Sequence, residues 1–492
     1  MCNRAVSNIL AKWEAEEPYQ YGAPLLALAG ESGTSFVVSD LHLGAGLATD
    51  GTSDGLENFF ADAAFTRFLD WANRRTSSGK ATLIINGDFV DFLRITTLPV
   101  SEDDFARWRK ILTELSISKT IDELKQSITD RERKYGLKTD DYKSVFKLSV
   151  VAKGHQPAFD TLAVWVGQGH RLIIIKGNHD LEWYWRAVRD RLRVILAQNI
   201  VRLQAAPDMT TALTSHVLPN TIFADHGVVL DGDMYLEHGH QYDKYSHVLG
   251  PAVLPGGTEL NIPFGSFLNR YLLNMVELHY PFVDNVRPAQ NLLPLLIRER
   301  FFLALKLLFY HIPFLILIIP KRYYRYMLAR VLPLAAVLAA PIGLLLWNLK
   351  GPLAAILRGG STSSIAQGLA GQLVLPVASY FLGRLIAYLQ LLEPSTLNPF
   401  ARDFFRGSPQ YRMATFGHTH NPDQFTDGNH HYCNTGTWIP VVETSTADLR
   451  TDLTYTFLEI GRDAQGLPLP PFLQRWDDDG GRAELLRVIR AD

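Results

Sequence analysis

The sequence predicts an α/β protein in which helices pack on a largely parallel sheet. Short apolar runs at 35–39, 81–86 and 171–175 each end abruptly at a polar turn, as buried strands do. The segments between these runs place apolar side chains at helical spacing. Strands and helices therefore alternate along the chain, which is the pattern of an α/β fold.

The predicted elements follow one another as β-α-β units. A short helix at 8–15 precedes the strand at 35–39. Phe60, Ala64, Phe68 and Trp71 recur at helical spacing, which predicts a crossover helix over 56–75 before the strand at 81–86. The elements predicted after these are a helix at 158–167, the strand at 171–175, strands within 221–237, a strand ending before 417, and a strand at 453–460.

Composition divides the chain into a soluble core and an apolar insertion. The core is predicted in two parts, 33–250 and 409–465, and the first part carries a charged helical insertion at about 100–155. That insertion is either a solvated helical face or a cap over the functional site. The predicted remainder is an N-terminal extension at 1–32, the apolar insertion at 251–408 and a C-terminal tail at 466–492.

Charge and cysteine content narrow the function classes. Lys plus Arg number 48 and Asp plus Glu number 50, so no basic excess indicates a nucleic-acid partner. The two cysteines, Cys2 and Cys433, imply no disulfide framework and fit a reducing compartment. The first residues lack the pattern of a signal peptide, so we expect a cytoplasmic location.

Five predicted strands end in loops that carry Asp, Asn or His. Mixed oxygen and nitrogen donors suit Mn, Fe, Zn or Co better than a carboxylate calcium site. Seven candidate ligands are too many for one tetrahedral ion, so the pattern predicts two ions that share a carboxylate. The candidate ligands are Asp40, His42, Asp88, Asn178, His238, His418 and His420.

This order of motifs resembles the calcineurin-like metallophosphoesterase superfamily, and it is similar in motif order to the UDP-2,3-diacylglucosamine pyrophosphohydrolases of lipid A synthesis. The resemblance covers roughly 33–245 and 412–460. It implies a four-layer α/β/β/α sandwich, interrupted here by the apolar helical insertion, with a dinuclear metal centre. By motif position, the first ion would be held by Asp40, His42 and His420, the second by Asn178, His238 and His418, and Asp88 would bridge them.

The chemistry of such a site is hydrolysis of a phosphoester or pyrophosphate bond. Two ions about 3.5–4 Å apart clamp a phosphoryl group and activate a bridging hydroxide for attack. Manganese is the expected metal, with iron or zinc as alternatives. His179 is not needed as a ligand, so it is the candidate that protonates the leaving oxygen, oriented by Asp91 or else by Asp180.

Substrate contacts are predicted for two further residues. His240 follows the motif residue His238, and it could be a ligand, a partner of a ligand or a substrate contact. Asp243 could contact substrate or make a hydrogen bond within its own loop.

The apolar insertion predicts an association with membrane lipid. The stretch 331–349 has no charged residue, and 366–392 is interrupted only by Arg384 among charged residues. Basic residues and tyrosines precede them between 298 and 330, as in a headgroup-level anchor. Three arrangements remain open. The first is a membrane-spanning hairpin of 331–349 with about 366–390, which keeps the basic residues before it on the cytoplasmic side. The others are an in-plane monotopic insertion and a buried soluble or oligomer-forming cap.

These features predict a phosphoesterase at the cytoplasmic face of a membrane, acting on a lipid or lipid-linked substrate. The alternative is a phosphodiesterase or phosphatase for a soluble nucleotide or phosphoprotein, with the insertion serving only as anchor. A non-catalytic membrane protein with a vestigial metal site is the third class.

Overall fold

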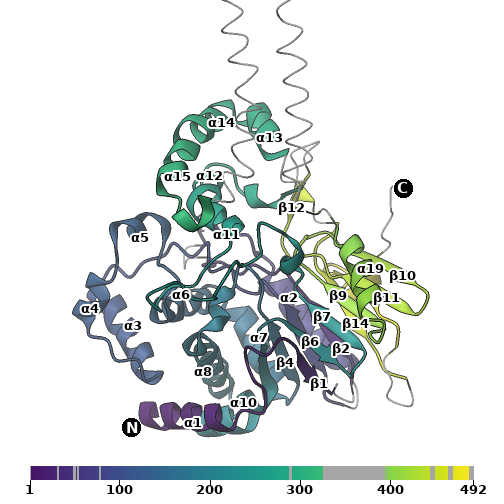
Figure 1. The fold of residues 1–492 in the computed structure, drawn as a ribbon. Helices are drawn as coiled ribbons and strands as arrows, with labels where there is room; N and C mark the ends of the chain where they lie inside the picture. Colours follow the sequence, from purple (N-terminus) through teal and green to yellow (C-terminus); the bar gives the residue numbers. More distant parts are fainter. Residues whose placement is uncertain are drawn as a thin grey trace, which may run out of the picture. The chain divides into compact units, whose positions relative to one another are not determined.

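The protein folds into two compact units, and the second interrupts the first in sequence (Figure 1). The first comprises Met1–Arg287 and Pro394–Asp492, and the second comprises Pro288–Glu393. The observed second unit is thus shorter than the predicted insertion at 251–408. The computed structural model describes residues 2–29, 33–47, 51–52, 55–76, 79–287, 291–324, 394, 396–443, 449–450, 452–463 and 469–486.

The first unit is built on a seven-stranded sheet, which confirms the predicted α/β class. Four parallel neighbours form its centre: β2 (Ser35–Val38), β3 (Thr82–Asn86), β4 (Arg171–Ile175) and β5 (Thr221–Ala224). Beside β2 lie three antiparallel strands, β14 (Thr456–Ile460), β15 (Phe472–Asp477) and β16 (Arg482–Leu485). The predicted tail at 466–492 therefore supplies the edge of this sheet.

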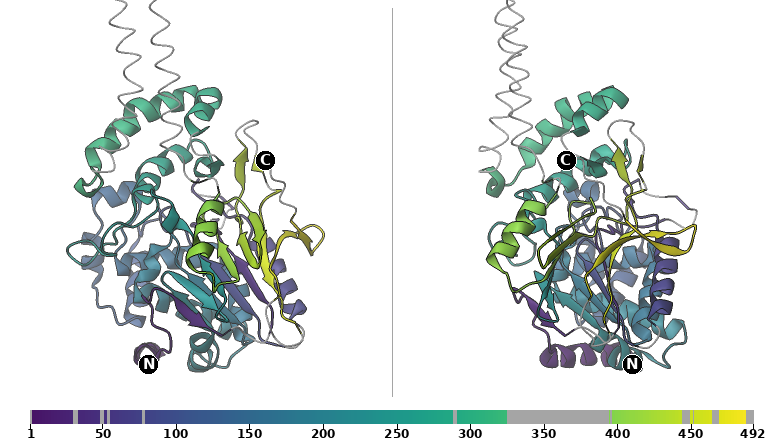
Figure 2. Two further views of the ribbon diagram at one scale, coloured as in Figure 1. Left: turned by 45° about the vertical axis from the view of Figure 1, so that its right-hand side comes forward. Right: turned by 90° about the vertical axis from the view of Figure 1, so that its right-hand side faces the viewer.

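A second sheet of six strands lies against the first (Figure 2). The predicted N-terminal extension contributes its edge strand, because β1 pairs with β6 in parallel. The strand order is β1 (Leu26–Leu28), β6 (Gly227–Leu230), β7 (Met234–Glu237), β9 (Met413–Phe416), β11 (His430–Asn434) and β10 (Asp423–Asp427). A small third sheet joins β13 (Leu449–Arg450), β12 (Val441–Glu443) and β8 (Val286–Arg287).

The central strands are buried on both faces, which explains their continuous apolar sequences. In β2, Phe36 and Val38 pack against helices, whereas Val37 packs into the core shared with the six-stranded sheet. Strands β3 and β4 show the same alternation. The helix layer contains α2 (Asp62–Arg75), α7 (Gln156–Gly167) and α8 (Arg186–Arg202), and α19 (Asn398–Gly407) packs on the other face of β9 and β11.

The predicted crossover helix at 56–75 is shorter than expected, because α2 begins at Asp62. The buried carboxylate of Glu57 accepts hydrogen bonds from the backbone N–H groups of Gly44, Gly46 and Phe59. These bonds fold residues 56–61 around a side chain, which prevents a helical turn there.

The charged segment at about 100–155 is helical, as predicted. It contains α3 (Glu102–Glu114), α4 (Ile121–Gln126), α5 (Asp130–Tyr135) and α6 (Asp141–Gly154). Capping boxes begin the first three of these helices, at Ser101, Thr120 and Thr129. Trp108 and Leu112 are fully buried, so the segment packs against the core and is not only a solvated face. The N-terminal helix α1 (Cys2–Glu16) contacts α3.

Short helices lie between β7 and β9 along the chain. Within the first unit they are α11 (Phe264–Leu268), η4 (Asn269–Leu273), α12 (Asn274–Glu277) and η5 (Val283–Asn285). The second unit contains α13 (Leu292–Glu299), α14 (Phe301–Lys306), η7 (Leu307–His311), α15 (Ile312–Ile318) and η8 (Lys321–Tyr323). The predicted apolar stretches at 331–349 and 366–392 lie outside the described residues.

A buried histidine joins the loop after β2 to the helix layer. His155 Nε2 lies 3.1 Å from Glu57 Oε2, and its Nδ1 lies 2.9 Å from Asp62 Oδ2. Burial alone would lower the pKa of His155, but the two carboxylates raise it to about 9. The folded state therefore favours the charged imidazolium at this position.

We expect His155→Gln to lower the free energy of unfolding by on the order of 3 kcal/mol near neutral pH. The folded pKa of about 9 exceeds the ordinary value of 6.5, so the contribution is complete below pH 6.5 and is lost as the pH rises through 9. The free energies of unfolding of wild type and variant, measured in urea, should thus become equal at alkaline pH. A stability difference that is independent of pH would contradict this explanation.

Candidate metal centre

The predicted ligands gather at the carboxyl ends of five strands. Asp40 and His42 follow β2, Asp88 follows β3, and Asn178 follows β4. His238 follows β7, and His418 and His420 follow its parallel neighbour β9. Parallel neighbours end at the same edge of a sheet, so the two packed sheets bring all seven side chains together.

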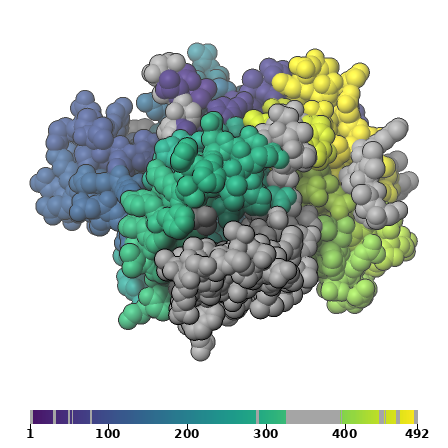
Figure 3. Space-filling view, turned by 90° about the horizontal axis from the view of Figure 1, so that it is seen from above, coloured from purple at the N-terminus to yellow at the C-terminus, as the bar shows by residue number. Residues whose placement is uncertain are grey.

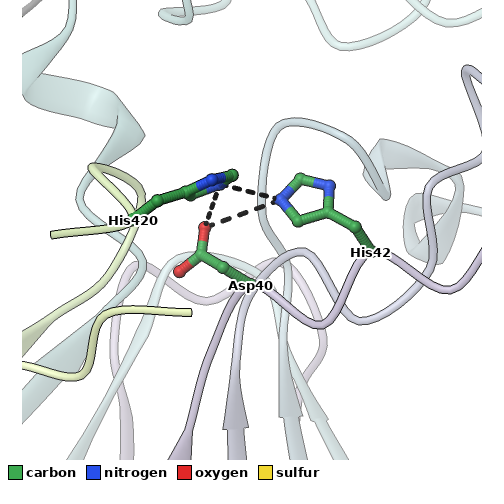
Figure 4. A group of neighbouring side chains, drawn as sticks. All are labelled: Asp40, His42 and His420. Atoms are coloured by element: carbon green, nitrogen blue, oxygen red, sulfur yellow. Dashed lines mark hydrogen bonds and ion pairs between the residues drawn. The ribbon is translucent and has the colours of Figure 1, made fainter. Parts of the chain in front are cut away.

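Asp40, His42 and His420 form the first group (Figure 4). The Nε2 atoms of the two histidines are 3.0 Å apart, and His420 Nε2 lies 3.3 Å from Asp40 Oδ1. This oxygen is buried and accepts no hydrogen bond from the described residues. A buried oxygen without a donor, faced by two imidazole nitrogens, is the arrangement that a cation would satisfy.

Asp88, His238 and His418 form a second group, and Asn178 adjoins it. His238 Nε2 lies 3.1 Å from Asp88 Oδ2 and 3.3 Å from Asn178 Oδ1. On its other side, His238 Nδ1 lies 2.9 Å from the carbonyl oxygen of Asn86, which can only accept. In the neutral ring Nδ1 therefore carries the proton, and Nε2 presents its lone pair to the group.

Asp88 lies between the two groups, as the predicted bridging ligand would. Its Oδ2 is 3.1 Å from His238 Nε2 and 3.7 Å from His42 Nε2. Its Oδ1 accepts a hydrogen bond of 2.8 Å from the backbone N–H of His179. One carboxylate oxygen is thus held by the backbone while the other faces a histidine of each group.

His179 contacts Asp91, which was the first of the two carboxylates predicted to orient it. Its Nδ1 lies 3.0 Å from Asp91 Oδ2, and the same oxygen lies 3.3 Å from His42 Nδ1. Asp180, the second choice, instead accepts hydrogen bonds from the backbone N–H groups of Gly177 and Phe89. Asp180 therefore joins the turns after β3 and β4, and Asp91 orients the two imidazoles.

A buried arginine behind Asp91 was not predicted. Arg94 Nε lies 2.9 Å from Asp91 Oδ2, and its guanidinium also contacts Glu277 at 2.7 Å and Asp284 at 3.0 Å. The spacing of Asp91 and Arg94 was a weak signal in the sequence. Glu277 and Asp284 are distant along the chain, so no local pattern could connect them to this site.

The electrostatics of the centre favour positive charge. Burial opposes the charged form of His42, but hydrogen-bonding Asp40 and Asp91 raise its pKa to about 10. Burial likewise opposes charge on His238, yet the nearby Asp88 raises its pKa to about 9. Burial raises the pKa of Asp180 to about 7, and the charge of Asp88 adds to this shift. Protons and metal ions would compete for these donors.

The ligand loops have a strained backbone. Ten non-glycine residues have positive φ among the described residues, and five of these are candidate ligands. Such conformations cost free energy and persist only where the surrounding structure enforces them. The five ligands are Asp40, His42, Asp88, His418 and His420.

Two motif glycines allow side chains to approach the backbone closely. A Cβ at Gly177 would lie 2.1 Å from Asp88 Oδ1, and a Cβ at Gly87 would lie 2.3 Å from the ring of His238. Gly87 also has a φ of 86°, which side chains disfavour. Any larger residue at either position would displace a candidate ligand.

His240 lies beside the ligands and lines a cavity of about 330 Å³. Its ring centre is 5.4 Å from that of His238, and its buried Nδ1 has no hydrogen-bond partner among the described residues. Burial lowers the pKa of His240 well below its usual value. The cavity is also lined by Lys176, Tyr184, Asp225, Gln241 and His247.

Asp243 is the other predicted substrate contact. Its carboxylate accepts a hydrogen bond from Ser246 within its own loop and faces His418 Nε2 at 3.3 Å.

Comparison with known proteins adds no family to this description. No family model matches the chain, and no curated protein or solved structure matches it. The buried Asp and His groups could hold a metal ion on the chemistry of their donors alone.

We expect Gly177→Ala to weaken binding of Mn²⁺ by at least about tenfold, because displacing Asp88 removes a donor shared by both groups. Isothermal titration with Mn²⁺ would measure the affinity. Gly167→Ala is the matched control, since its Cβ would meet only ordinary contacts of 3.5 Å or more. Unchanged Mn²⁺ affinity in a folded Gly177→Ala protein would contradict this role for the close approach.

Proposed function

We propose that this protein is a metal-dependent phosphoesterase with a dinuclear centre. The observation that carries the proposal is the position of Asp88 between two groups of donors, each with histidine Nε2 atoms directed inward. Asp40, His42 and His420 would hold one ion, and Asn178, His238 and His418 the other. Manganese is the expected metal, with iron or zinc as alternatives, because the donors mix carboxylate, amide and imidazole.

Divalent ions held there would stabilise negative charge on a phosphoryl group and lower the pKa of water. The chain's own residues would provide orientation and proton transfer. Asp91 holds His179 through Nδ1, which leaves Nε2 to deliver a proton to the departing oxygen. Arg94 would fix Asp91 through their contact and through its own pairs with Glu277 and Asp284.

The four-layer α/β/β/α sandwich is the fold that this proposal implies. Two observations support it: the two large sheets share one apolar core, and helices pack on the faces directed away from that core.

The substrate that we propose is a lipid or a lipid-linked phosphate or pyrophosphate. The cavity beside His240 would hold the organic group attached to the scissile phosphoryl, and its volume lies within the usual range for small-molecule sites. One helical run in the described residues, Phe301–Ile318, is long and apolar enough to cross a membrane by length and composition. The alternative substrate is a soluble nucleotide or phosphoprotein.

We expect the Mn²⁺-loaded protein to hydrolyse an aryl phosphate ester, and two variants to fail for different reasons. His179→Ala should lower kcat by about 10²–10⁴-fold while retaining metal, because it removes only the proton donor. Asp88→Asn should lose both metal and activity. Metal analysis and initial rates would separate the two, with His216→Ala as a control distant in sequence from all ligands. A wild-type protein that binds no divalent metal would refute the proposal.

The lipid substrate can be tested in detergent micelles with the full chain. For a lipid substrate, we expect the rate to follow the mole fraction of substrate in the micelle at constant bulk concentration. A rate that follows only bulk concentration, together with equal or greater activity on soluble nucleotides, would favour the alternative substrate.

A further inference from the structure

The second unit contains a helical run with two different faces. From Phe301 to Ile318, α14, η7 and α15 form one continuous run. One face is buried, at Ala304, Leu307, His311 and Leu315. The spacing of these residues is that of a single helix face, so this side already packs against protein.

The opposite face is exposed and mostly apolar, and the exposed Lys306 lies on it between Phe302 and Phe309. Phe302 is 83% exposed, Phe309 is 77% exposed and Leu317 is 83% exposed, at intervals of about seven residues. Single exposed apolar residues are ordinary, but an aligned row of large ones marks a contact surface. The exposed apolar face consists of Phe301, Phe302, Phe309, Tyr310, Ile316 and Leu317. These helices belong to the blue-green atoms in Figure 3, which the colour bar places near residue 300.

Positive charge surrounds this apolar face. Residues 291–324 contain five basic side chains and one acidic side chain, Glu299. Arg298, which lies before the run, pairs with Glu299 at 2.7 Å, while Lys321 and Arg322 follow the run. Tyr324 is also exposed, at 43%. An apolar face bordered by cations and tyrosines complements a bilayer with anionic headgroups.

The same features disfavour a transmembrane orientation for this run. Lys306 and His311 lie within the run, and a cation near the bilayer centre is costly. An in-plane orientation avoids this cost, because Lys306 can extend to the headgroups and His311 stays buried in protein.

We propose that the exposed apolar face of 301–317 lies in the plane of an anionic lipid surface, at the boundary of headgroups and acyl chains. The proposal goes beyond phosphoester hydrolysis and does not depend on it. It assigns the lipid contact to one helix face, and it places both ends of the run at equal depth.

Spin-label depth measurements on the full chain would test this orientation. Single cysteines would replace Phe302, Phe309 and Leu317 in a Cys2→Ser background, in which the buried Cys433 is retained. The labelled proteins would be bound to vesicles of phosphatidylcholine and phosphatidylglycerol. Collision with oxygen and with a water-soluble nickel complex would then report depth. A label at Val100, which is 86% exposed in the first unit, is the control expected to remain in water.

We expect the three labels to lie at the same shallow depth, each protected from nickel and accessible to oxygen. A depth that changes steadily from 302 to 317 would show a spanning helix and overturn the proposal. Nickel accessibility equal to that of the Val100 control at all three positions would exclude lipid contact and overturn it as well.

A variant with two carboxylates on the exposed face provides an independent test. In a Phe302→Glu, Leu317→Glu protein, the label at 309 should become accessible to nickel, because two carboxylates oppose insertion. Hydrolysis of a soluble aryl phosphate should be unchanged in this variant, so loss of docking and loss of catalysis are distinguishable. Continued protection of the label at 309 would overturn the assignment to this face.

Discussion

The arrangement of the first unit depends on one buried carboxylate, that of Asp88. It is 1% exposed, and its partners are the backbone N–H of His179 and the imidazoles of His238 and His42. A buried charge is tolerated only when it is paired and hydrogen-bonded. These partners follow β2, β4 and β7, so the charge is satisfied only if both sheets place their strand ends together. Burial of Asp88 and correct packing of the two sheets therefore require one another.

This requirement explains the unusual backbone around the site. Asp40, His42, Asp88, His418 and His420 all have positive φ, although none is glycine. Stability alone would favour relaxed turns at these positions, so the strain is offset by the extensive apolar core beneath the site. Gly177 and Gly87 have the complementary role, since a side chain at either would occupy the space of a ligand. The strained backbone of the ligand loops, together with the absence of a side chain at the two glycines, allows the donors to lie close to one another.

The two units follow different physical rules. In the first, apolar side chains face shared cores, and the buried polar groups cluster at the strand ends. In the second, large apolar side chains of the 301–318 run are exposed opposite a buried face. The first pattern is that of a water-soluble domain, and the second requires a further apolar partner. This contrast supports the proposal that a soluble phosphoesterase core carries a lipid-binding insertion.

The sequence by itself determined the α/β class, the central strands β2, β3 and β4, and the set of candidate ligands. These features depend on local patterns, namely apolar runs that end at polar residues and glycine. The contact between Asp91 and His179 could also be predicted, because both residues lie in the loops that follow the neighbouring strands β3 and β4. Parallel strand ends converge whatever the details of packing, so a motif read along the chain is also a cluster in space.

Only the tertiary structure decided the features that join distant segments. The pairing of Arg94 with Glu277 and Asp284, the cavity beside His240, and the places of β1, β15 and β16 in the sheets all fall in this class. So does the late start of α2, which follows from the buried carboxylate of Glu57. The apolar run at 301–318 was visible in the sequence, but its buried face was not. Local composition fixes how apolar a helix is, whereas the choice of the face that packs depends on neighbours that composition does not specify.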